Sequence, residues 1–331
     1  MQDLNPNTAG QVKAQDLLNV TVSRRSRETA EVALIELKSA TSEPLPAFGA
    51  GDHIDVHLPD GVIRQYSISN APGQRDHYRL GVLLANKSRG GSRAMHALKV
   101  GETLRISRPR NAFKLNDTAE KTVLIGGGIG ITPLMAMASH LSETGREFEL
   151  HYCARSKLHA AFRKTLSKSA FSKNIHWHFD SAAGRTTLDP GQVMADPSAA
   201  KHLYVCGPTG FMNFIRQSAS EAGWADSNVH FEAFEPLLPT GDEKEFELRA
   251  ARSGLDLVVR PNQTAAQALE EAGISVAVSC EQGICGTCLV SILEGTAEHR
   301  DSYQTDEEKK LNRQFALCCS RSKSEKLVLE I

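Results

Sequence analysis

Aromatic residues and net charge are both scarce in this sequence of 331 residues. Phenylalanine, tryptophan and tyrosine together make up only 6%, and 38 basic residues almost balance 39 acidic ones to give a net charge of −1. A chain that binds nucleic acid or an anionic membrane surface by electrostatic attraction carries an excess of lysine and arginine, and base stacking needs aromatic rings. We therefore expect neither nucleic acid nor a membrane as a partner.

Long apolar runs are missing as well. The most apolar stretch, Val123–Ala138, is interrupted by four glycines and a proline, and no run reaches the roughly 18 residues needed to span a bilayer. The first ten residues, MQDLNPNTAG, are polar and lack the apolar segment of a signal peptide. We therefore predict a flexible N-terminus over residues 1–10 and a cytoplasmic location.

The apolar residues that are present, 40% of the total, can fill several cores, and the length allows two or three domains. Residues 11–115 show short apolar runs between turn residues, which is typical of a sandwich or small barrel. Residues 116–234 alternate strand-like and helix-like segments, which indicates a parallel sheet in an α/β domain. Residues 235–244 contain two prolines and a glycine and therefore indicate a linker. In the third domain, residues 245–331, Thr264 is expected to cap a helix.

Five of the seven cysteines lie in the last 52 residues. Cys280, Cys285 and Cys288 follow the pattern C-x4-C-x2-C, and 29 residues separate Cys288 from Cys318. This spacing resembles that of plant-type ferredoxins, whose four cysteines bind a 2Fe–2S cluster. By that resemblance the ligands are Cys280, Cys285, Cys288 and Cys318, while Cys319 is an ordinary small residue that points to the opposite face of a strand. A structural zinc site is the alternative, but it would have to use the adjacent Cys318 and Cys319 as a pair.

A glycine-rich loop follows the apolar run Thr122–Ile125 and reads GGGIGITP over residues 126–133. A strand, a glycine turn and a helix N-terminus together form a site for a phosphate, because backbone amides and the helix dipole face it. The loop departs from G-x-G-x-x-G and the acidic residue expected after the second strand is missing, so an ordinary tight turn remains an alternative. A second segment, YVCGPTGFM over residues 204–212, follows later in the same domain.

Together the two segments resemble the NAD domain of ferredoxin–NADP reductase-type flavoproteins. The resemblance implies that the dinucleotide contacts Gly127, Gly128, Gly130, Thr132, Pro133, Arg155, Gly207 and Pro208. It also implies that Cys206 lines the hydride-transfer site, although a cysteine in a strand is more often a small buried residue. Arg155, at a strand end, could reach a 2′-phosphate; the resemblance nevertheless implies that NADH is preferred over NADPH.

Residues 64–67 read RQYS and match the flavin motif R-x-Y-S of the same superfamily. Alternate residues of a strand share a face, so Arg64 and Tyr66 are expected to point the same way. The resemblance assigns Arg64 to the flavin phosphate, Tyr66 to the isoalloxazine ring and the hydroxyl group of Ser67 to the reactive ring nitrogen. Phe234 is the candidate for the aromatic residue that relatives place over the flavin.

A second anion site is expected at Arg89, Gly90, Gly91 and Ser92, where a short helix over Ser92–Leu98 begins. These residues resemble the phosphate loop of the FMN-binding reductases of phthalate and vanillate oxygenase systems. One phosphate with several donors favours FMN over FAD, because the second half of FAD would need an adenine site that the sequence does not reveal.

The chain resembles the phthalate dioxygenase reductase and vanillate demethylase reductase family over nearly its whole length. In both, a flavin domain is followed by an NAD domain and then by a C-terminal ferredoxin domain. The resemblance implies an antiparallel β-barrel, a parallel α/β domain and an α+β (β-grasp) ferredoxin domain. It further implies a monomer that passes electrons from NADH through FMN and a 2Fe–2S cluster to a separate Rieske-type terminal oxygenase. A stand-alone diaphorase or ferric reductase is the alternative enzyme, and a zinc-stabilised binding module is the alternative without enzymatic activity.

His176 and His178 alternate with Trp177 and Phe179. A strand would therefore place both histidines on one face, as a pair of metal ligands requires. Simple alternation of polar and apolar faces also accounts for the pattern, and we predict no metal site here.

Overall fold

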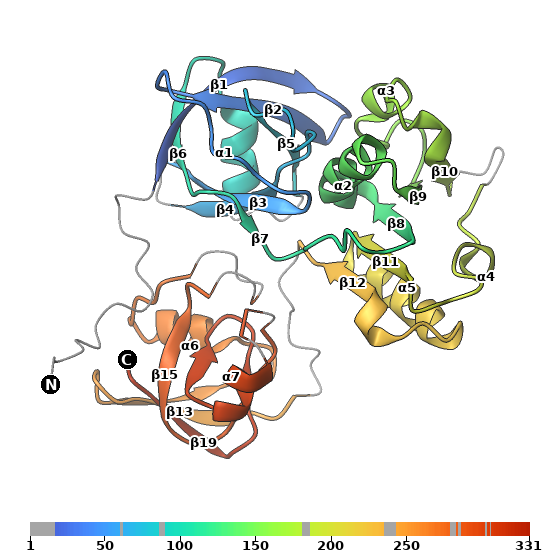
Figure 1. Cartoon of the computed structure of the whole chain (residues 1–331). Coiled ribbons are helices and arrows are strands. Elements are labelled where there is room, and N and C mark those ends of the chain that lie inside the picture. The colour runs from blue at the N-terminus through green and yellow to red at the C-terminus, as the bar shows by residue number, and fades with distance from the viewer. Residues whose placement is uncertain are drawn as a thin grey trace, which may run out of the picture. The chain divides into compact units, whose positions relative to one another are not determined.

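The computed structural model describes residues 17–59, 62–85, 90–180, 186–234, 243–278, 283, 286–301, 303–304 and 306–331. The chain divides into two compact units, one that ends at Phe234 and one that follows it (Figure 1). Within the described residues, no helix combines the length and the apolar content that crossing a bilayer requires.

The first part of the first unit is an antiparallel barrel (Figure 1). Its strands are β1 (Leu18–Arg27), β2 (Val32–Ser39), β3 (Asp52–His57), β4 (Ile63–Ser67), β5 (Tyr78–Leu83), β6 (Thr103–Ile106) and β7 (Arg110–Asn111). They pair in the order β4-β3-β6-β1-β2-β5, with β7 beside β3. A bridge between Ile68, just after β4, and Leu80 in β5 joins the two ends of this order, so the sheet closes on itself. The expected antiparallel barrel is confirmed.

The barrel core follows from the alternation of side chains along its strands. In β1, Val20 and Val22 are fully buried while Thr21 between them is partly exposed, because successive side chains point to opposite faces. The short helix α1 (Gly91–Ala97) adds Met95 to the same core. The helix predicted over Ser92–Leu98 is therefore confirmed to within one residue.

The second part of the first unit is the predicted parallel sheet, and helices lie on both of its faces (Figure 1). Its strands are β8 (Lys121–Gly127), β9 (Glu147–Ala154), β10 (Ile175–Phe179), β11 (Lys201–Cys206) and β12 (Val229–Glu232), in the order β10-β9-β8-β11-β12. The helices are α2 (Ile131–Glu143), α3 (Arg163–Leu166), α4 (Pro190–Val193) and α5 (Thr209–Glu221). Leu124 of β8 packs in the core that contains α2, whereas Val123 and Ile125 pack in the core that contains α5.

The strand order reverses between β8 and β11, which are neighbours in the sheet although β9 and β10 come between them in sequence. Open α/β sheets bind their ligands at the carboxyl ends of the strands beside such a reversal. Here Gly126 of β8 is the register partner of Cys206 of β11, and each strand leads into one of the two predicted nucleotide loops. The fold therefore brings these loops together at the expected place.

The second unit has a mixed sheet packed against a helix (Figure 1). Its elements are β13 (Phe246–Ala250), β14 (Leu255–Val259), α6 (Ala265–Glu271), β15 (Leu289–Glu294), β16 (Ala297–Glu298), α7 (Asp306–Leu311), β17 (Gln314–Ala316), β18 (Arg321–Ser322) and β19 (Lys326–Leu329). The sheet order is β14-β13-β19-β15-β17, in which β13 and β19 are parallel. Thr264 caps α6 as predicted, since its hydroxyl group accepts a hydrogen bond from the Gln267 amide in a capping box.

The domain limits stay predictions. The limit between residues 115 and 116 falls between β7 and β8, inside the first compact unit. Of the linker predicted over residues 235–244, only Glu243 and Lys244 belong to the described residues.

Candidate functional site

Two glycine-rich loops pack directly against each other where the strand order reverses. Gly130 ends the single 3₁₀ turn after β8, and an added Cβ there would fall 2.2 Å from the carbonyl oxygen of Cys206. A Cβ on Gly127 or on Gly207 would fall 2.8 Å from the ring of Phe211. Any residue larger than glycine would push the loops apart, so the packing explains these three glycines. The structure thus brings Gly127, Gly130, Cys206 and Gly207 together.

A buried carboxyl group lies where the barrel meets the parallel sheet. Ser67 ends β4, and its hydroxyl group donates a hydrogen bond of 3.5 Å to Oε2 of Glu232, the last residue of β12. Only 5% of Ser67 and 6% of Glu232 is exposed. Burial raises the pKa of Glu232 to about 8, although the hydrogen bond from Ser67 acts in the opposite direction. The carboxyl group is therefore mostly protonated at neutral pH.

Cys206 lies beside this pair. It is fully buried at the carboxyl end of β11, and it is the register partner of Glu232 on β12. Burial, together with the nearby Glu232 carboxyl group, raises the pKa of the Cys206 thiol well above its ordinary value. Hydroxyl, carboxyl and thiol groups that are neutral at pH 7 therefore gather at one buried place, where they can donate hydrogen bonds without adding a charge.

The predicted phosphate residues of the barrel also come together. Arg64 lies across the start of α1, because a Cβ on Gly91 would fall 2.6 Å from Cγ and from Nε of Arg64. Gly90 has a φ of 103°, in the left-handed region that favours glycine. The Ser92 hydroxyl group accepts a hydrogen bond of 3.2 Å from the amide of Ala85. A guanidinium group beside the first turn of a helix fits a single phosphate group, and the lack of a side chain at Gly91 lets Arg64 lie this close to the helix.

Tyr66 precedes Ser67 on β4 and packs against the barrel core, where burial raises its pKa. Arg89, the remaining predicted phosphate residue, lies outside the described residues. The structure therefore places Arg64, Tyr66 and Ser67 on one strand whose end reaches Glu232 of the parallel sheet.

A cavity of about 370 Å³ lies between the barrel and the parallel sheet. Of the predicted nucleotide residues, Gly127, Gly128, Arg155 and Pro208 line it. The other lining residues are Thr29, Glu31, Val32 and Leu83 from the barrel and Ile129, Cys153, Ala154, His159, Ala161, Asp180 and Phe211 from the sheet and its loops. Because one wall comes from the barrel and the other from the parallel sheet, a ligand bound to the sheet can react with a group bound to the barrel.

An ion pair crosses this cavity from one wall to the other. Nη2 of Arg155 lies 2.7 Å from Oε2 of Glu31, and both side chains are exposed. The barrel carboxylate therefore pairs with Arg155, the arginine expected to be able to reach a 2′-phosphate.

Thr132, Pro133 and Phe234 are among the predicted site residues that do not line the cavity. The hydroxyl group of Thr132 donates a hydrogen bond of 3.0 Å to the carbonyl oxygen of Ile129, and its methyl group lies against Gly81 of β5. Pro133 is buried in the first turn of α2. Phe234 packs against the core that contains α2. The cofactor contacts assigned to these three residues stay predictions.

Cys288 and Cys318 come together in the second unit. The amide of Leu317 donates a hydrogen bond of 3.2 Å to the carbonyl oxygen of Cys288, and the thiols of Cys288 and Cys318 lie within hydrogen-bonding distance. Gly283 and Gly286 have φ values of 76° and 72°, which glycine adopts readily. Adjacent buried thiols beside such a loop fit an iron–sulfur cluster. Cys280 and Cys285 lie outside the described residues.

The prediction that Cys319 lies in a strand is wrong. Strand β17 ends at Ala316, and the amides of Cys319 and Ser320 both donate hydrogen bonds to its carbonyl oxygen, at 3.3 and 3.0 Å, which forms a turn. Side chains do not alternate between two faces in a turn, and a Cβ on Gly283 would fall 2.6 Å from Sγ of Cys319. Both thiols therefore lie near the loop. The choice of Cys318 as a ligand stays a prediction, supported by its contact with Cys288.

Three acidic residues at the cavity and at the Ser67 contact were not predicted from the sequence: Glu31, Asp180 and Glu232. Glu232 interrupts an otherwise apolar strand end, FEAF, and that interruption was the available signal. No acidic residue follows β9, the second strand of the sheet in sequence, where the nucleotide motif would place one. Asp180 instead follows β10, the third strand, and lines the cavity. Glu31 comes from the barrel, and no pattern within the nucleotide domain could have indicated it.

Comparisons with known proteins define the class first. Residues 124–217 match an oxidoreductase NAD-binding domain, and residues 248–323 match a 2Fe-2S iron-sulfur cluster binding domain. Together with the barrel, these matches define an NAD-dependent iron–sulfur oxidoreductase.

Relatives that match along the whole chain define the family. The chain is 44% identical over 317 residues to the vanillate O-demethylase oxidoreductase of Pseudomonas sp., with 95% of this chain and 100% of the relative covered. It is 37% identical to the carnitine monooxygenase reductase subunit of Escherichia coli, with 95% and 98% covered. The solved structure of phthalate dioxygenase reductase is similar with a TM-score of 0.72 and 32% identity, with 96% and 98% covered. The chain belongs to the phthalate dioxygenase reductase and vanillate demethylase reductase family.

The cofactors and the general activity follow from this membership. The two matched domains correspond to NADH and to a 2Fe–2S cluster, and FMN is the flavin of the family. The protein is an iron–sulfur flavoprotein that serves as the reductase component of an oxygenase system.

Proposed function

We propose that this chain passes electrons from NADH to a Rieske-type terminal oxygenase, and that Ser67, Cys206 and Glu232 surround the place where hydride transfer occurs. The observation that carries the proposal is the hydrogen bond between Ser67 of the barrel and Glu232 of the parallel sheet. It supports a single reaction site to which the flavin half and the nucleotide half of the first unit both contribute.

The barrel side of the site holds the flavin. Bound FMN supplies the ability to accept a hydride as two electrons and to release electrons singly. Arg64, the Gly90–Ser92 segment and Arg89 bind its phosphate, and Tyr66 and Phe234 pack against its ring. The hydroxyl group of Ser67 lies at the reactive ring nitrogen and can turn its single hydrogen from Glu232 to that atom.

The sheet side of the site holds the nicotinamide nucleotide. Gly127, Gly128, Gly130, Thr132 and Pro133 accommodate the diphosphate, and Gly207 and Pro208 position the nicotinamide beside Cys206. Cys206 and Glu232 are both neutral at pH 7, so neither adds a fixed charge next to the hydride while it is transferred. The ion pair between Arg155 and Glu31 supports NADH rather than NADPH as the donor, because it engages the arginine that a 2′-phosphate would need.

Cys280, Cys285, Cys288 and Cys318 ligate the 2Fe–2S cluster, and single electrons leave the protein from this cluster. We further propose that the protein is a monomer, which gel filtration followed by light scattering tests. We also propose that it is cytoplasmic, which cell fractionation tests.

Coupled turnover tests the whole proposal. The holoprotein is mixed with NADH and candidate Rieske-type oxygenases, and product formation is compared with the reduction of a two-electron dye. Cys318→Ser should abolish product formation and spare dye reduction, because the dye can take electrons from the flavin directly. A stand-alone diaphorase predicts that no oxygenase turns over and that the variant behaves like the wild type in both assays.

A further inference from the structure

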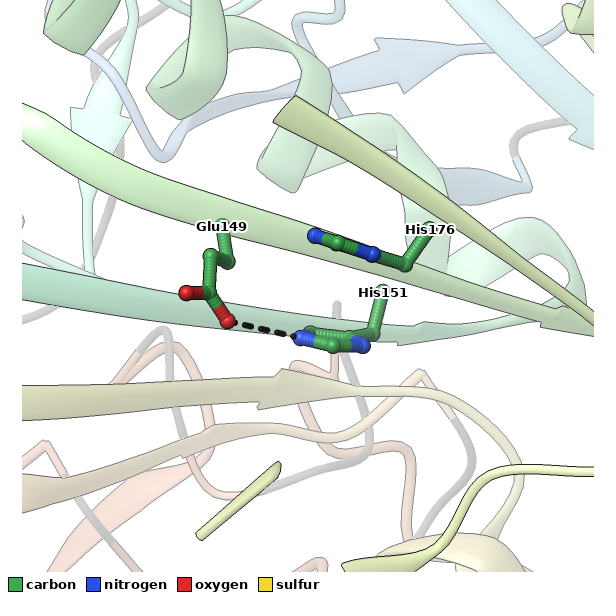
Figure 2. A group of neighbouring side chains, drawn as sticks. All are labelled: Glu149, His151 and His176. Carbon is green, nitrogen blue, oxygen red and sulfur yellow. Dashed lines mark hydrogen bonds and ion pairs between the residues drawn. The ribbon is translucent and has the colours of Figure 1, made fainter. Parts of the chain in front are cut away.

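A line of imidazoles occupies the face of β9 and β10 opposite the core that contains α2. Glu149 and His151 alternate with buried Leu150 on β9, and His176 on β10 is the register partner of His151. Figure 2 shows the Glu149 carboxylate and the rings of His151 and His176 gathered at one place, with the first two joined by a hydrogen bond. Glu149, His151 and His176 are not among the described residues that line the nucleotide cavity.

Hydrogen bonds connect these side chains in a line with an acceptor at both ends. Nδ1 of His178 lies 3.1 Å from the carbonyl oxygen of Thr186, and Nε2 of His178 lies 3.0 Å from Nδ1 of His151. Nε2 of His151 then lies 3.3 Å from Oε2 of Glu149. Three contacts between two acceptor ends require three hydrogens, but two neutral imidazoles carry only two. With two neutral rings one of the three contacts lacks its hydrogen, and a further cation, either a proton or a metal ion, would fill that place.

A second imidazole pair in the same sheet shows no such deficit. Nδ1 of His202 lies 2.9 Å from Nε2 of His230, and Nε2 of His202 lies 3.0 Å from Nδ2 of the Asn116 side chain. This line begins at a donor, the side-chain NH2 group of Asn116, so two neutral rings satisfy every contact. The deficit at the line that ends at Glu149 is therefore absent from this second pair.

The geometry at the Glu149 end suits a metal ion. One ligand atom each from Glu149, His151 and His176 can be chosen so that all three lie within 4.8 Å of one another. Two atoms bound at about 2.1 Å to a tetrahedral ion lie about 3.4 Å apart, so the separation between His151 and Glu149 already fits. His176 is exposed and stacks on His151 with ring centroids 4.7 Å apart, so a small rotation of its side chain completes the set.

A lysine fixes the carboxylate. Nζ of Lys121 lies 2.6 Å from Oε1 of Glu149, which leaves Oε2 facing His151. Lys121 also lies 3.6 Å from Glu147, which offsets part of its charge. The lysine orients the ligand oxygen but weakens the attraction for a cation, and this second effect provides a test.

The sequence alone predicted no metal site at His176 and His178; from the strand register and the contacts described here we propose instead that Glu149, His151 and His176 bind a divalent transition-metal ion of the zinc type. Two imidazoles and one carboxylate form an established ligand set for zinc, and solvent completes the coordination because the site is open at His176. His178 orients His151 through the hydrogen bond to its other ring nitrogen, as second-sphere partners of metal-bound histidines do. This site is additional to the cysteine cluster and shares no residue with it.

Equilibrium dialysis of the untagged, cluster-loaded full chain against Zn²⁺ tests the proposal, with zinc and iron both measured by elemental analysis. The wild type should bind about one zinc per chain without losing iron. Glu149→Gln and His176→Ala should weaken zinc binding by at least about tenfold, since each removes a ligand. Neither change disturbs the core, because Glu149 is only partly buried and His176 is exposed.

Two further variants sharpen the test. His230→Ala removes a ring from the satisfied imidazole pair and should leave zinc binding unchanged. Lys121→Gln should tighten zinc binding, because it removes the competing positive charge. Failure to bind zinc, binding that is equal in the wild type and His176→Ala, or zinc uptake at the expense of iron would each overturn the proposal; in the first two cases the missing cation is a proton.

Discussion

The hydroxyl group of Ser67 lies 3.5 Å from the carboxyl group of Glu232, although 165 residues separate the two in sequence. Ser67 ends a barrel strand and Glu232 ends a strand of the parallel sheet, so this contact joins the two halves of the first unit. Both groups are buried and Cys206 lies beside Glu232. The contact marks the site at which we expect the hydride to move.

Ser67→Ala should slow the reduction of bound flavin by NADH about a hundredfold, the loss typical when one positioned hydrogen-bond donor is removed. Anaerobic stopped-flow absorbance measures this rate. Ser69→Ala is the matched control, because the Ser69 hydroxyl group is also buried but donates to the carbonyl oxygen of Arg79. Equal rates in the two variants would show that Ser67 has no special role.

Glu232→Gln should flatten the pH dependence of stability. Burial raises the pKa of Glu232 to about 8 in the folded protein, above its ordinary value of 4.5. Below pH 4.5 the Glu232 carboxyl group is protonated in both the folded and the unfolded protein. Between pH 4.5 and about pH 8 only the folded protein keeps the proton, so the free energy of unfolding falls as pH rises, by up to about 1.4 kcal/mol per pH unit. Above about pH 8 the contribution of Glu232 to the free energy of unfolding no longer changes. Thermal unfolding at pH 5 and pH 8 measures the effect, and parallel profiles for variant and wild type would contradict it.

Arg64→Ala should weaken FMN binding about tenfold or more, because a charge-assisted hydrogen bond to phosphate contributes roughly 1.5–3 kcal/mol. Flavin fluorescence during dilution of the holoprotein measures the affinity. Arg105→Ala, which changes an exposed arginine on barrel strand β6, is the control and should retain FMN. An Arg64→Ala protein that purifies with its full flavin content would show that the phosphate lies elsewhere.

Glu31→Ala should raise kcat/KM for NADPH about tenfold and change kcat/KM for NADH little. The substitution releases Arg155 from its 2.7 Å ion pair, and the freed guanidinium group can then bind a 2′-phosphate. Adding Arg155→Ala to the same protein should abolish the gain. If the wild type prefers NADPH, or if the double variant keeps the gain, the ion pair does not determine the choice of donor.

Cys318→Ser should lose the visible spectrum of the 2Fe–2S cluster while NADH still reduces the flavin, and Cys319→Ser should keep cluster content near that of the wild type. The contact between the thiols of Cys318 and Cys288 is the basis of this expectation. Because both thiols lie near the loop, iron analysis of the two variants is needed to decide between them. Loss of the cluster in Cys319→Ser alone would reverse the assignment.

The sequence predicted those parts of the molecule that depend on spacing within one segment. The cysteine pattern from Cys280 to Cys288 and the glycine loop after β8 are local, and the helix cap at Thr264 needs only its own helix. Contacts between distant segments were not predictable in the same way. The hydrogen bond from Ser67 to Glu232 depends on how the barrel packs against the sheet, and the grouping of His151 with His176 depends on the register of two strands. The turn at Cys319 replaced an expected strand because β17 ends at Ala316.

The order of electron transfer tests the central claim most directly. Anaerobic rapid mixing of the holoprotein with NADH, recorded at flavin and cluster wavelengths, should show that the flavin is reduced first and the cluster afterwards. In protein stripped of FMN, NADH should leave the cluster oxidised until FMN is added back. Reduction of the cluster by NADH at an undiminished rate in the flavin-free protein would contradict the account.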